Sequence, residues 1–257
     1  MSIEFGPASF SALPLKRLVE IRSSNVDKIV DPDEQRVRLC NYVDVYYNNL
    51  IRIDLPLSVG SATHREIRKF CLREDDVLIT KDSETPDDIA VPAFVEQTAE
   101  DIVCGYHLAL LRPFKERIKG KFLFNFLKSH SARAAFYVRA QGITRFGLTL
   151  PGIGSVLCPA PGLEVQESVV NFLDVETALF DRMIEKAGGQ DSASAATPGS
   201  FLNILLEQRA ALITAAVTGQ IDVETWAKRG GGRPSRQNKF EGKTDAAPAA
   251  KQVEARA

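Results

Sequence analysis

The segment GYHLALLRPFKERIKGKFLFNFLK, residues 105–128, changes from the periodicity of a strand to that of a helix. Tyr106, Leu108 and Leu110 alternate with His107, Ala109 and Leu111, which predicts a strand buried on both faces. From 119 to 139 the apolar residues share one helical face, and they are Phe122, Leu123, Phe126, Leu127 and Ala134. A strand followed so closely by a helix predicts an α+β fold.

Short apolar runs on both sides extend this pattern. Four more stretches, bounded by turn residues, are predicted to be strands: 18–22, 37–43, 76–81 and 154–161. We therefore assign residues 1–162 to one domain of short mixed strands and helices.

Strand signals stop at Leu163, and two helical stripes follow. The first helix is expected over 164–187, about 36 Å at 1.5 Å per residue, and the second over 201–219. A Gly- and Ser-rich stretch near 188–200 breaks the arm, which we assign to 163–223. Both stripes need a partner, either each other or another chain. The expected interface residues are Val169, Phe172, Leu179, Met183, Leu205, Leu212 and Ile213.

Residues 224–257 contain few large apolar side chains and include RGGGRPSRQNK. Such a segment buries too little surface to offset its ordering entropy, so we predict a disordered basic tail. Its cations are most simply solvated, although contact with nucleic acid stays open.

Composition sets the broad class of the protein. The chain is 44% hydrophobic and 25% charged, which predicts a folded core, and no apolar run is long enough for a membrane span. The N-terminal residues lack the features of a secretory signal. The four cysteines are widely separated and form no CxxC pair, so we expect reduced thiols and a cytoplasmic protein.

Charge is distributed unevenly behind the net value of −1. Residues 112–145 contain nine Lys and Arg against the single acid Glu116, whereas residues 73–101 are rich in Asp and Glu. A basic run with interspersed aromatic residues favours DNA or RNA contact over a plain solvated face. A shorter basic patch, 64–69, is ambiguous.

Catalytic motifs are absent from the sequence. There is no phosphate-binding GxxxxGK[ST], no HExxH and no GxSxG, and the three histidines are far apart. We therefore predict no catalytic residue and no metal site in this chain, and a binding role.

Base reading requires polar side chains aimed at base edges, and predicted loops supply them. These candidates are equally suited to forming turns. The DNA-binding candidates are Asn25, Lys28, Asn48, Lys81, Ser83, Arg139, Gln141, Thr144 and Arg145.

Taken together, several segments resemble a known family. LKRLVEIRSSNVDK, VRLCNYVDVYYNN, LREDDVLITKDSE, GYHLALLRP and FLFNFLKS…AQGITRFGLTL resemble the target recognition domain of the specificity subunit of type I restriction-modification systems. PAPGLEVQESVVNFLDVETALFDRMIEK and EQRAALITAAVTGQIDV resemble the start and end of that family's helical region. The resemblance covers roughly residues 13–223.

The resemblance implies a non-catalytic DNA-reading subunit with its recognition domain followed by a long helical arm. Its partners would be double-stranded DNA, a modification subunit that methylates adenine, and a restriction or motor subunit. This chain would carry no cofactor, since S-adenosylmethionine, ATP and Mg are used by the companion subunits.

Three departures from the family pattern qualify this implication. The chain has one recognition domain and one helical region instead of two, the stretch 188–200 interrupts the helix, and Glu164-Val165-Gln166 replaces the usual Glu-Gln pair. The first departure suggests a half subunit that forms a homodimer or pairs with a second half subunit, so that two domains read a split site. A protein-binding scaffold and an inactive truncated fragment are the alternatives.

Overall fold

The computed structural model describes residues 10–188, 197 and 199–228. Its central element is a five-stranded sheet in the order β2-β10-β6-β8-β4. These strands are β2 (Val19–Ser23), β10 (Leu108–Pro113), β6 (Val77–Thr80), β8 (Pro92–Val95) and β4 (Leu50–Ile51). All neighbouring pairs are antiparallel except β4 and β8.

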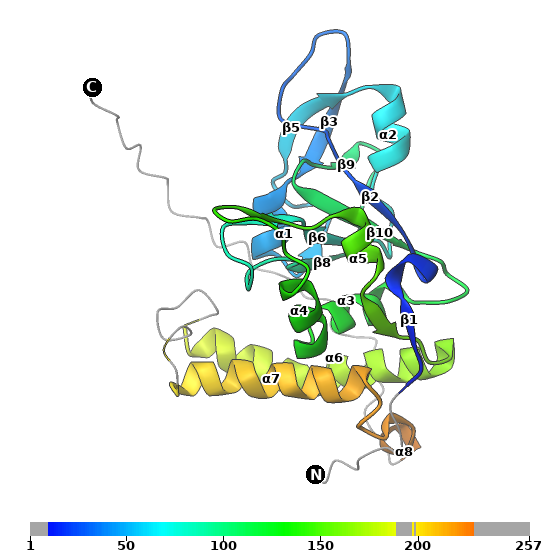
Figure 1. Ribbon diagram of the computed structural model, residues 1–257, viewed down its shortest axis with the longest axis vertical. Helices are drawn as coiled ribbons and strands as arrows, with labels where there is room; N and C mark the ends of the chain where they lie inside the picture. Colours follow the sequence, from blue (N-terminus) through cyan, green and yellow to red (C-terminus); the bar gives the residue numbers. More distant parts are fainter. Residues whose placement is uncertain (1–9, 189–196, 198, 229–257) are drawn as a thin grey trace.

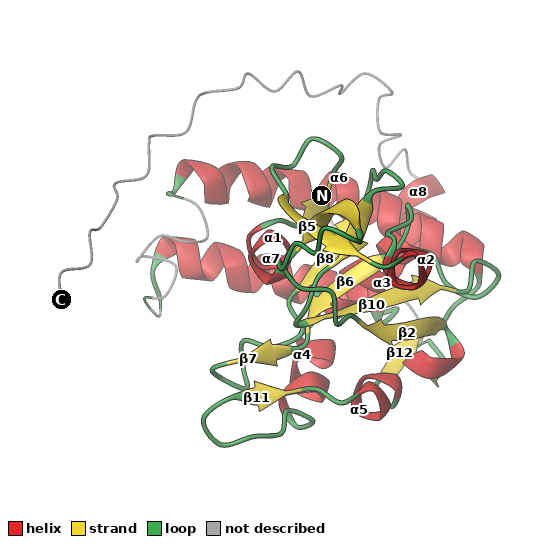
Figure 2. Ribbon diagram, turned by 90° about the horizontal axis from the view of Figure 1, so that it is seen from above, coloured by secondary structure: helices red, strands yellow, loops and turns green. Residues whose placement is uncertain are grey.

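Three smaller sheets surround it. A three-stranded sheet joins β5 (Ser58–Ala62), β3 (Gln35–Cys40) and β9 (Ile102–Cys104), and it lies above the central sheet in Figure 1. Strands β1 (Ala12–Pro14) and β12 (Leu157–Pro159) form one pair, and the short 3₁₀ helix η1 (Leu15–Arg17) follows β1. Strands β7 (Asp82–Ser83) and β11 (Phe146–Gly147) form another pair, which lies apart from the central sheet (Figure 2).

The helices occupy the remaining surfaces. α2 (His64–Phe70) packs on the upper sheet at β5 and β9, and α1 (Tyr42–Tyr47) lies against β4, β6 and β8 of the central sheet. α3 (Gly120–Leu127), α4 (His130–Tyr137) and α5 (Leu150–Gly154) lie below the upper sheet. Beneath them, α6 (Leu163–Lys186) and α7 (Phe201–Val217) lie side by side, followed by α8 (Val223–Lys228). The model is thus α+β with a long helical arm, as the sequence predicts.

Strand alternation divides the core between two clusters. Leu108 and Leu110 face the cluster under the upper sheet, whereas Ala109 and Leu111 face the cluster shared with α3, α6 and α7. β10 is therefore buried on both faces, which confirms the expectation from 105–113, although Tyr106 precedes the strand and is exposed. The lower cluster contains both Val156 and Val169, so it continues across residue 162, and the division of the chain there stays a prediction.

Two predicted elements differ from the structure. The strand expected over 37–43 ends at Cys40, because the side chains of Asn41 and Asp44 form a capping box that starts α1. The helix expected over 119–139 is two helices, since Ser129 accepts a hydrogen bond from the Ala132 amide and begins α4.

The two arm helices partner each other. Phe172 of α6 and Ile213 of α7 belong to the lower core, and Ile184 near the end of α6 packs with Leu202 and Leu205 at the start of α7. These pairings make α6 and α7 an antiparallel hairpin within one chain. Glu176, the one acid in the apolar stripe of α6, accepts a hydrogen bond at 3.1 Å from the indole of Trp226.

That same Trp226 packs edge-on against Phe172 with ring centroids 5.1 Å apart. The prediction of a disordered tail is therefore wrong for residues 224–228, which form most of α8. The rest of the predicted tail and most of the stretch 188–200 lie outside the described residues.

Candidate nucleic-acid interface

Helix α1 places three tyrosines along one wall of a hollow. Tyr42 and Tyr46 are one helical turn apart and stack with ring centroids 5.6 Å apart, while Tyr47 meets Tyr46 edge-on at 5.0 Å. The Tyr47 side chain is 66% exposed, so its ring is available to a ligand. We call this space, of about 520 Å³, the tyrosine hollow; it is lined by Tyr42, Val43, Tyr46, Tyr47, Asp82, Ser83, Glu84, Thr85, Asp88, His107 and Arg145.

The opposite wall comes from segments far apart in the chain. β7 contributes Asp82 and Ser83, and its pairing with β11 brings the preceding loop, with exposed Arg145, to the same place. Gln141 and Gly147 close that loop through two backbone hydrogen bonds of 3.0 and 2.8 Å. Long-range strand pairing therefore assembles the hollow.

His107 is held at this wall in an unusual backbone conformation. Its φ of +68° lies in the left-handed region, which costs a non-glycine residue about 1 to 3 kcal/mol. Its Nδ1 lies 2.7 Å from Asp82 Oδ2, and its carbonyl accepts the Lys81 amide at 2.9 Å. Backbone strain concentrates where function requires a defined side-chain position.

Asp82 is a shared acceptor for two cationic or polar groups. Partial burial raises its pKa, but hydrogen bonds from Lys81 Nζ at 2.8 Å and from His107 outweigh this effect, and the net pKa is lowered. Tyr46 donates to Asp88 Oδ2 at 2.9 Å, and that bond, with burial, raises the pKa of Tyr46 to about 12. Tyr46 therefore stays a neutral donor at physiological pH.

The electrostatic character of the hollow is mixed. Three carboxylates, Asp82, Glu84 and Asp88, face two fixed cations, Arg145 and Lys81. Such a site offers donors and acceptors for base edges together with aromatic faces, but it does not attract a polyanion by net charge.

The predicted DNA-binding residues do not all lie at the hollow. Ser83 and Arg145 line it, Lys81 lies beside it through its ion pair with Asp82, and Gln141 and Thr144 lie exposed on the loop that carries Arg145. Lys28 lies close enough to Asp44 of α1 for its charge to oppose the rise that burial causes in that carboxyl's pKa.

The other three candidates have structural partners. Asn48 donates to the Asp44 carbonyl at 2.8 Å and so ends α1. Asn25 donates to Glu66 beside α2, and Arg139 donates to Ser155 Oγ at 2.9 Å and to the Ala135 carbonyl. The structure does not bring these three side chains into the hollow, so their role in DNA contact stays a prediction.

Most cations of the basic stretch 112–145 have partners within the fold, and contact of this stretch with nucleic acid stays a prediction. Arg112 pairs with Asp76 at 2.7 Å, Lys119 with Glu167 at 3.0 Å and Lys121 with Asp174 at 2.7 Å. Lys128 donates to Asn49 at 2.8 Å, and its ammonium lies 4.9 Å from the centre of the Phe124 ring. Most of these cations join parts of the fold to one another.

The predicted partner interface is also partly internal. Val169, Phe172, Leu205 and Ile213 are at most 4% exposed, because the hairpin buries them, so they are not a free surface in this structure. Met183 and Leu212 pack at the edges of the same clusters. Leu179 is 56% exposed, and its contact with a partner stays a prediction.

Sequence reasoning did not select the tyrosines of α1. The signal was available, since Asn41 and Asp44 have the spacing of a helix cap and Tyr42 and Tyr46 are four residues apart. Within the described ranges, no three His, Cys, Asp or Glu side chains gather as metal ligands, and no described helix has the length and apolar character to span a membrane.

Comparisons with known proteins concern the fold. No family model matches the sequence, and no curated protein is significantly similar. Similar solved structures include the type I restriction-modification S subunit from M. genitalium, with 12% identity and a TM-score of 0.42 over 70% of this chain and 41% of that one. The HsdS subunit from Thermoanaerobacter tengcongensis has 15% identity and a TM-score of 0.44, over 83% of this chain and 46% of that one.

A third similar structure is the type IIL restriction-modification enzyme MmeI in complex with DNA. It has 14% identity and a TM-score of 0.46, over 84% of this chain and 34% of that one. The chain thus spans less than half the length of each of these three proteins.

Proposed function

We propose that this chain is the DNA-recognition subunit of a type I restriction-modification complex and reads one half of a split target through the tyrosine hollow. The observation that carries the proposal is that Ser83 and Arg145, which the sequence predicts as base readers from two distant loops, line the hollow together beside the tyrosines of α1, with Lys81 next to them through its ion pair with Asp82. The sequence resemblance to the target recognition domain also supports it.

The hollow supplies suitable chemistry for base recognition. The guanidinium of Arg145 can donate two hydrogen bonds to O6 and N7 of guanine. Carboxylates such as Glu84 can accept from the exocyclic amine of cytosine, and the exposed ring of Tyr47 offers an apolar surface. Asp82 already accepts hydrogen bonds from Lys81 and His107. Its role is therefore to hold the wall of the hollow in place, and we do not assign it a base contact.

The chain itself would perform no chemistry in this role. Adenine methylation would come from a modification subunit with S-adenosylmethionine, and cleavage from a motor subunit with ATP and Mg. Two such chains, or this chain and a second half subunit, would present two hollows and so read a split site. Exposed Leu179, Phe201 and Ile204 at the far end of the hairpin offer apolar surface for a companion subunit.

Methylation mapping tests this function. DNA is sequenced for adenine methylation from cells that carry the companion modification subunit with this chain, without it, or with its Arg145→Ala variant. We expect a split motif that needs the chain and is lost or relaxed at one position in the variant. An assembled complex with no motif contradicts the proposal and favours the protein-binding scaffold.

A further inference from the structure

Helix α2 is fixed at both ends despite having only seven residues. At its start, Thr63 and Glu66 form a capping box, with the Glu66 amide donating to Thr63 Oγ1 at 3.2 Å and the Thr63 amide donating to Glu66 Oε2 at 3.0 Å. Asn25 donates to the other Glu66 oxygen at 2.7 Å. Hydrogen bonds from Thr63 lower the pKa of Glu66, whose charge is thus used within the fold.

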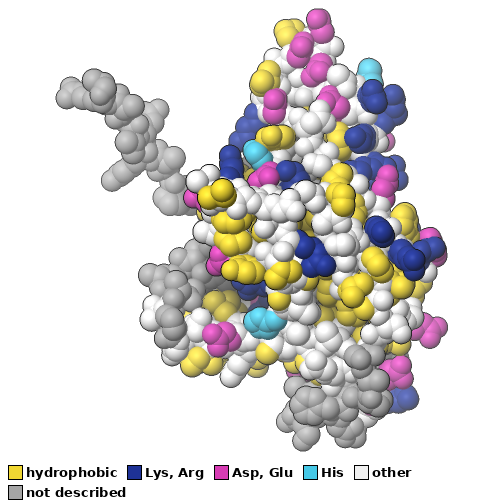
Figure 3. All heavy atoms as spheres, in the orientation of Figure 1, with side chains coloured by type: hydrophobic (Ala, Val, Ile, Leu, Met, Phe, Trp, Pro, Cys, Tyr) yellow, Lys and Arg dark blue, Asp and Glu magenta, His cyan; other side chains and the backbone are white. Residues whose placement is uncertain are grey.

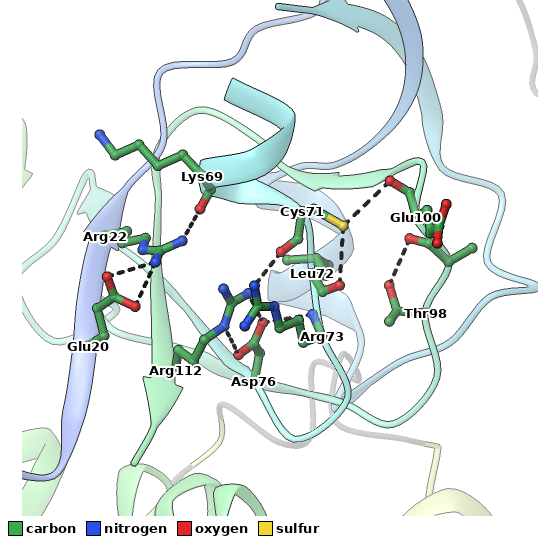
Figure 4. A network of polar contacts seen from close by, with 11 residues as sticks. Glu20, Arg22, Lys69, Cys71, Leu72, Arg73, Asp76, Thr98, Glu100 and Arg112 are labelled. Atoms are coloured by element: carbon green, nitrogen blue, oxygen red, sulfur yellow. Dashed lines mark hydrogen bonds and ion pairs between the residues drawn. The ribbon is translucent and has the colours of Figure 1, made fainter. Parts of the chain in front are cut away.

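Two arginines of the central sheet hold the other end, as Figure 4 shows. Arg22 of β2 donates to the Lys69 carbonyl, and Arg112 of β10 donates to the Cys71 carbonyl at 2.8 Å. Arg112 is fixed in turn by Asp76, at 2.7 and 2.9 Å. These bonds satisfy carbonyls that a helix end leaves open, and they fix the position of α2 on the sheet.

Exposed cations follow one side of this fixed helix. Arg68 and Lys69 follow Arg65 by three and four residues, so the three side chains share one side of the helix. Arg73 follows in the next loop. Within the described chain none of the four forms an ion pair; Lys69 only lies over the Phe70 ring. We call these four residues the α2 cation face, and Figure 3 shows Lys and Arg side chains gathered over α2.

Helix stability does not account for this arrangement. Cations in the last turn of a helix interact favourably with its dipole, and this explains Arg68 and Lys69. Arg65 lies in the first turn, where positive charge is unfavourable. Like charges at this spacing also repel. Two surface hollows beside α2 contain three acids, Glu66, Glu100 and Asp101. Glu66 caps the helix and Asp101 pairs with Arg38, so Glu100 is the one acid of these hollows that neither caps α2 nor pairs with Arg38.

We propose that the α2 cation face binds the phosphate backbone of the same DNA duplex whose bases enter the tyrosine hollow. This inference rests on the proposed function. Phosphate contacts supply most of the sequence-independent free energy of DNA binding. Because the tyrosine hollow has no net positive charge, a protein that reads bases there needs cations elsewhere on its surface to bind the phosphates.

The loop after β2 connects the two regions. Asn25 donates to Glu66 of α2, and Lys28, three residues later, lies near Asp44 of α1, the helix that carries the tyrosines. The backbone from Asn25 to Lys28 spans at most about 11 Å, which is comparable to the roughly 12 Å width of the major groove. A short loop therefore joins α2 to α1, and the proposal is that one duplex contacts both.

The test is the salt dependence of DNA binding. The chain, assembled with its modification subunit, is prepared as wild type, as Arg65→Gln/Arg68→Gln and as the matched control Arg182→Gln/Lys186→Gln on exposed positions of α6. Equilibrium affinity is measured over a range of salt for the methylated target duplex and for an unrelated duplex.

We expect the α2 variant to reduce the slope of log affinity against log salt by about 1.8, or about 0.9 for each lost phosphate contact. Both duplexes should weaken together, so the ratio of their affinities stays constant, and the control should keep the wild-type slope. Arg65→Lys/Arg68→Lys should retain the slope because it retains the charge, which separates charge from packing.

An unchanged slope in the α2 variant, with sequence-specific binding intact, overturns the phosphate proposal and leaves the proposed function standing. If the α2 variant no longer assembles with the modification subunit but keeps the wild-type slope of log affinity against log salt, the phosphate proposal is overturned. The α2 cation face would then bind an acidic surface of that subunit. A wild-type complex that binds neither duplex contradicts the proposed function itself, and the α2 proposal with it.

Discussion

The chain contains two groups of cations that look alike in the sequence and differ in the fold. Arg112, Lys119 and Lys121 meet carboxylates 36, 48 and 53 residues away and hold strands and helices together. Arg65 and Arg68 of α2 lie exposed and outside any ion pair in the described part of the chain. The longer basic stretch serves mostly the fold, with Arg145 at the tyrosine hollow as an exception, so the density of charge in a sequence is a poor guide to where a polyanion binds.

The largest expected effect concerns a cation of the structural group. Arg112→Ala would leave Asp76, which is 1% exposed, without its ion-pair partner inside the fold. Breaking a buried pair in this way costs about 3 to 5 kcal/mol of the free energy of unfolding. Chemical denaturation of the purified chain measures it.

Two matched replacements sharpen that measurement. Lys121→Ala removes a half-exposed pair and should cost about 1 kcal/mol or less, and Arg65→Ala should change stability by about 0.5 kcal/mol or less. Equal losses for Arg112→Ala and Arg65→Ala would remove the distinction between the two groups.

Lys128, also in the basic stretch, predicts a pH dependence. Burial lowers its pKa from 10.5 to about 7. Between pH 7 and 10 the unfolded chain holds this proton and the folded chain does not, so the free energy of unfolding rises with pH in this window. We expect Lys128→Met to remove about 2 to 4 kcal/mol of that rise, after allowance for partial solvent contact.

Denaturation curves of wild type and Lys128→Met at pH 7, 8.5 and 10 test this prediction. The difference between the two proteins isolates Lys128 from the cysteines and tyrosines, which titrate in both. Parallel pH profiles would show that Lys128 is charged and solvated at pH 7.

A smaller effect is expected at the tyrosine hollow and should change specificity instead of stability. Arg145→Ala should reduce discrimination between the target and a single-base-pair variant of it by about 1 to 3 kcal/mol at one position. Arg139→Ala is the matched control, because Arg139 is bound to Ser155 and the Ala135 carbonyl. Competition binding measures both, and equal losses from the two variants would place base reading outside the hollow.

The sequence predicted those parts of the fold that depend on local pattern. β10 was predictable because a nearly continuous apolar run indicates burial on both faces, and α6 because its apolar stripe is long. The start of α1 was missed because Tyr42 and Val43 suit a strand, and the cap formed by Asn41 and Asp44 overrides that preference. The tail prediction missed α8 because Trp226 finds its partner Glu176 fifty residues away.

The sequence predicted several residues of the candidate site, but it did not predict how they are arranged in space. Lys81, Ser83 and Arg145 were selected for chemistry and loop position, yet the approach of Arg145 to Ser83 depends on the pairing of Ser83 with Phe146. Local periodicity carries no information about which distant strands pair. The basic patch 64–69 was visible in the sequence but stayed ambiguous, since its proposed role depends on which cations form no ion pair in the folded chain.

The most direct measurement is a structure of this chain with its modification subunit on a target duplex found by methylation mapping. The account predicts Arg145 and Tyr47 against base edges in a groove and Arg65 and Arg68 against phosphates of the same duplex. A duplex that lies on another surface and leaves both the tyrosine hollow and the α2 cation face in solvent would contradict it.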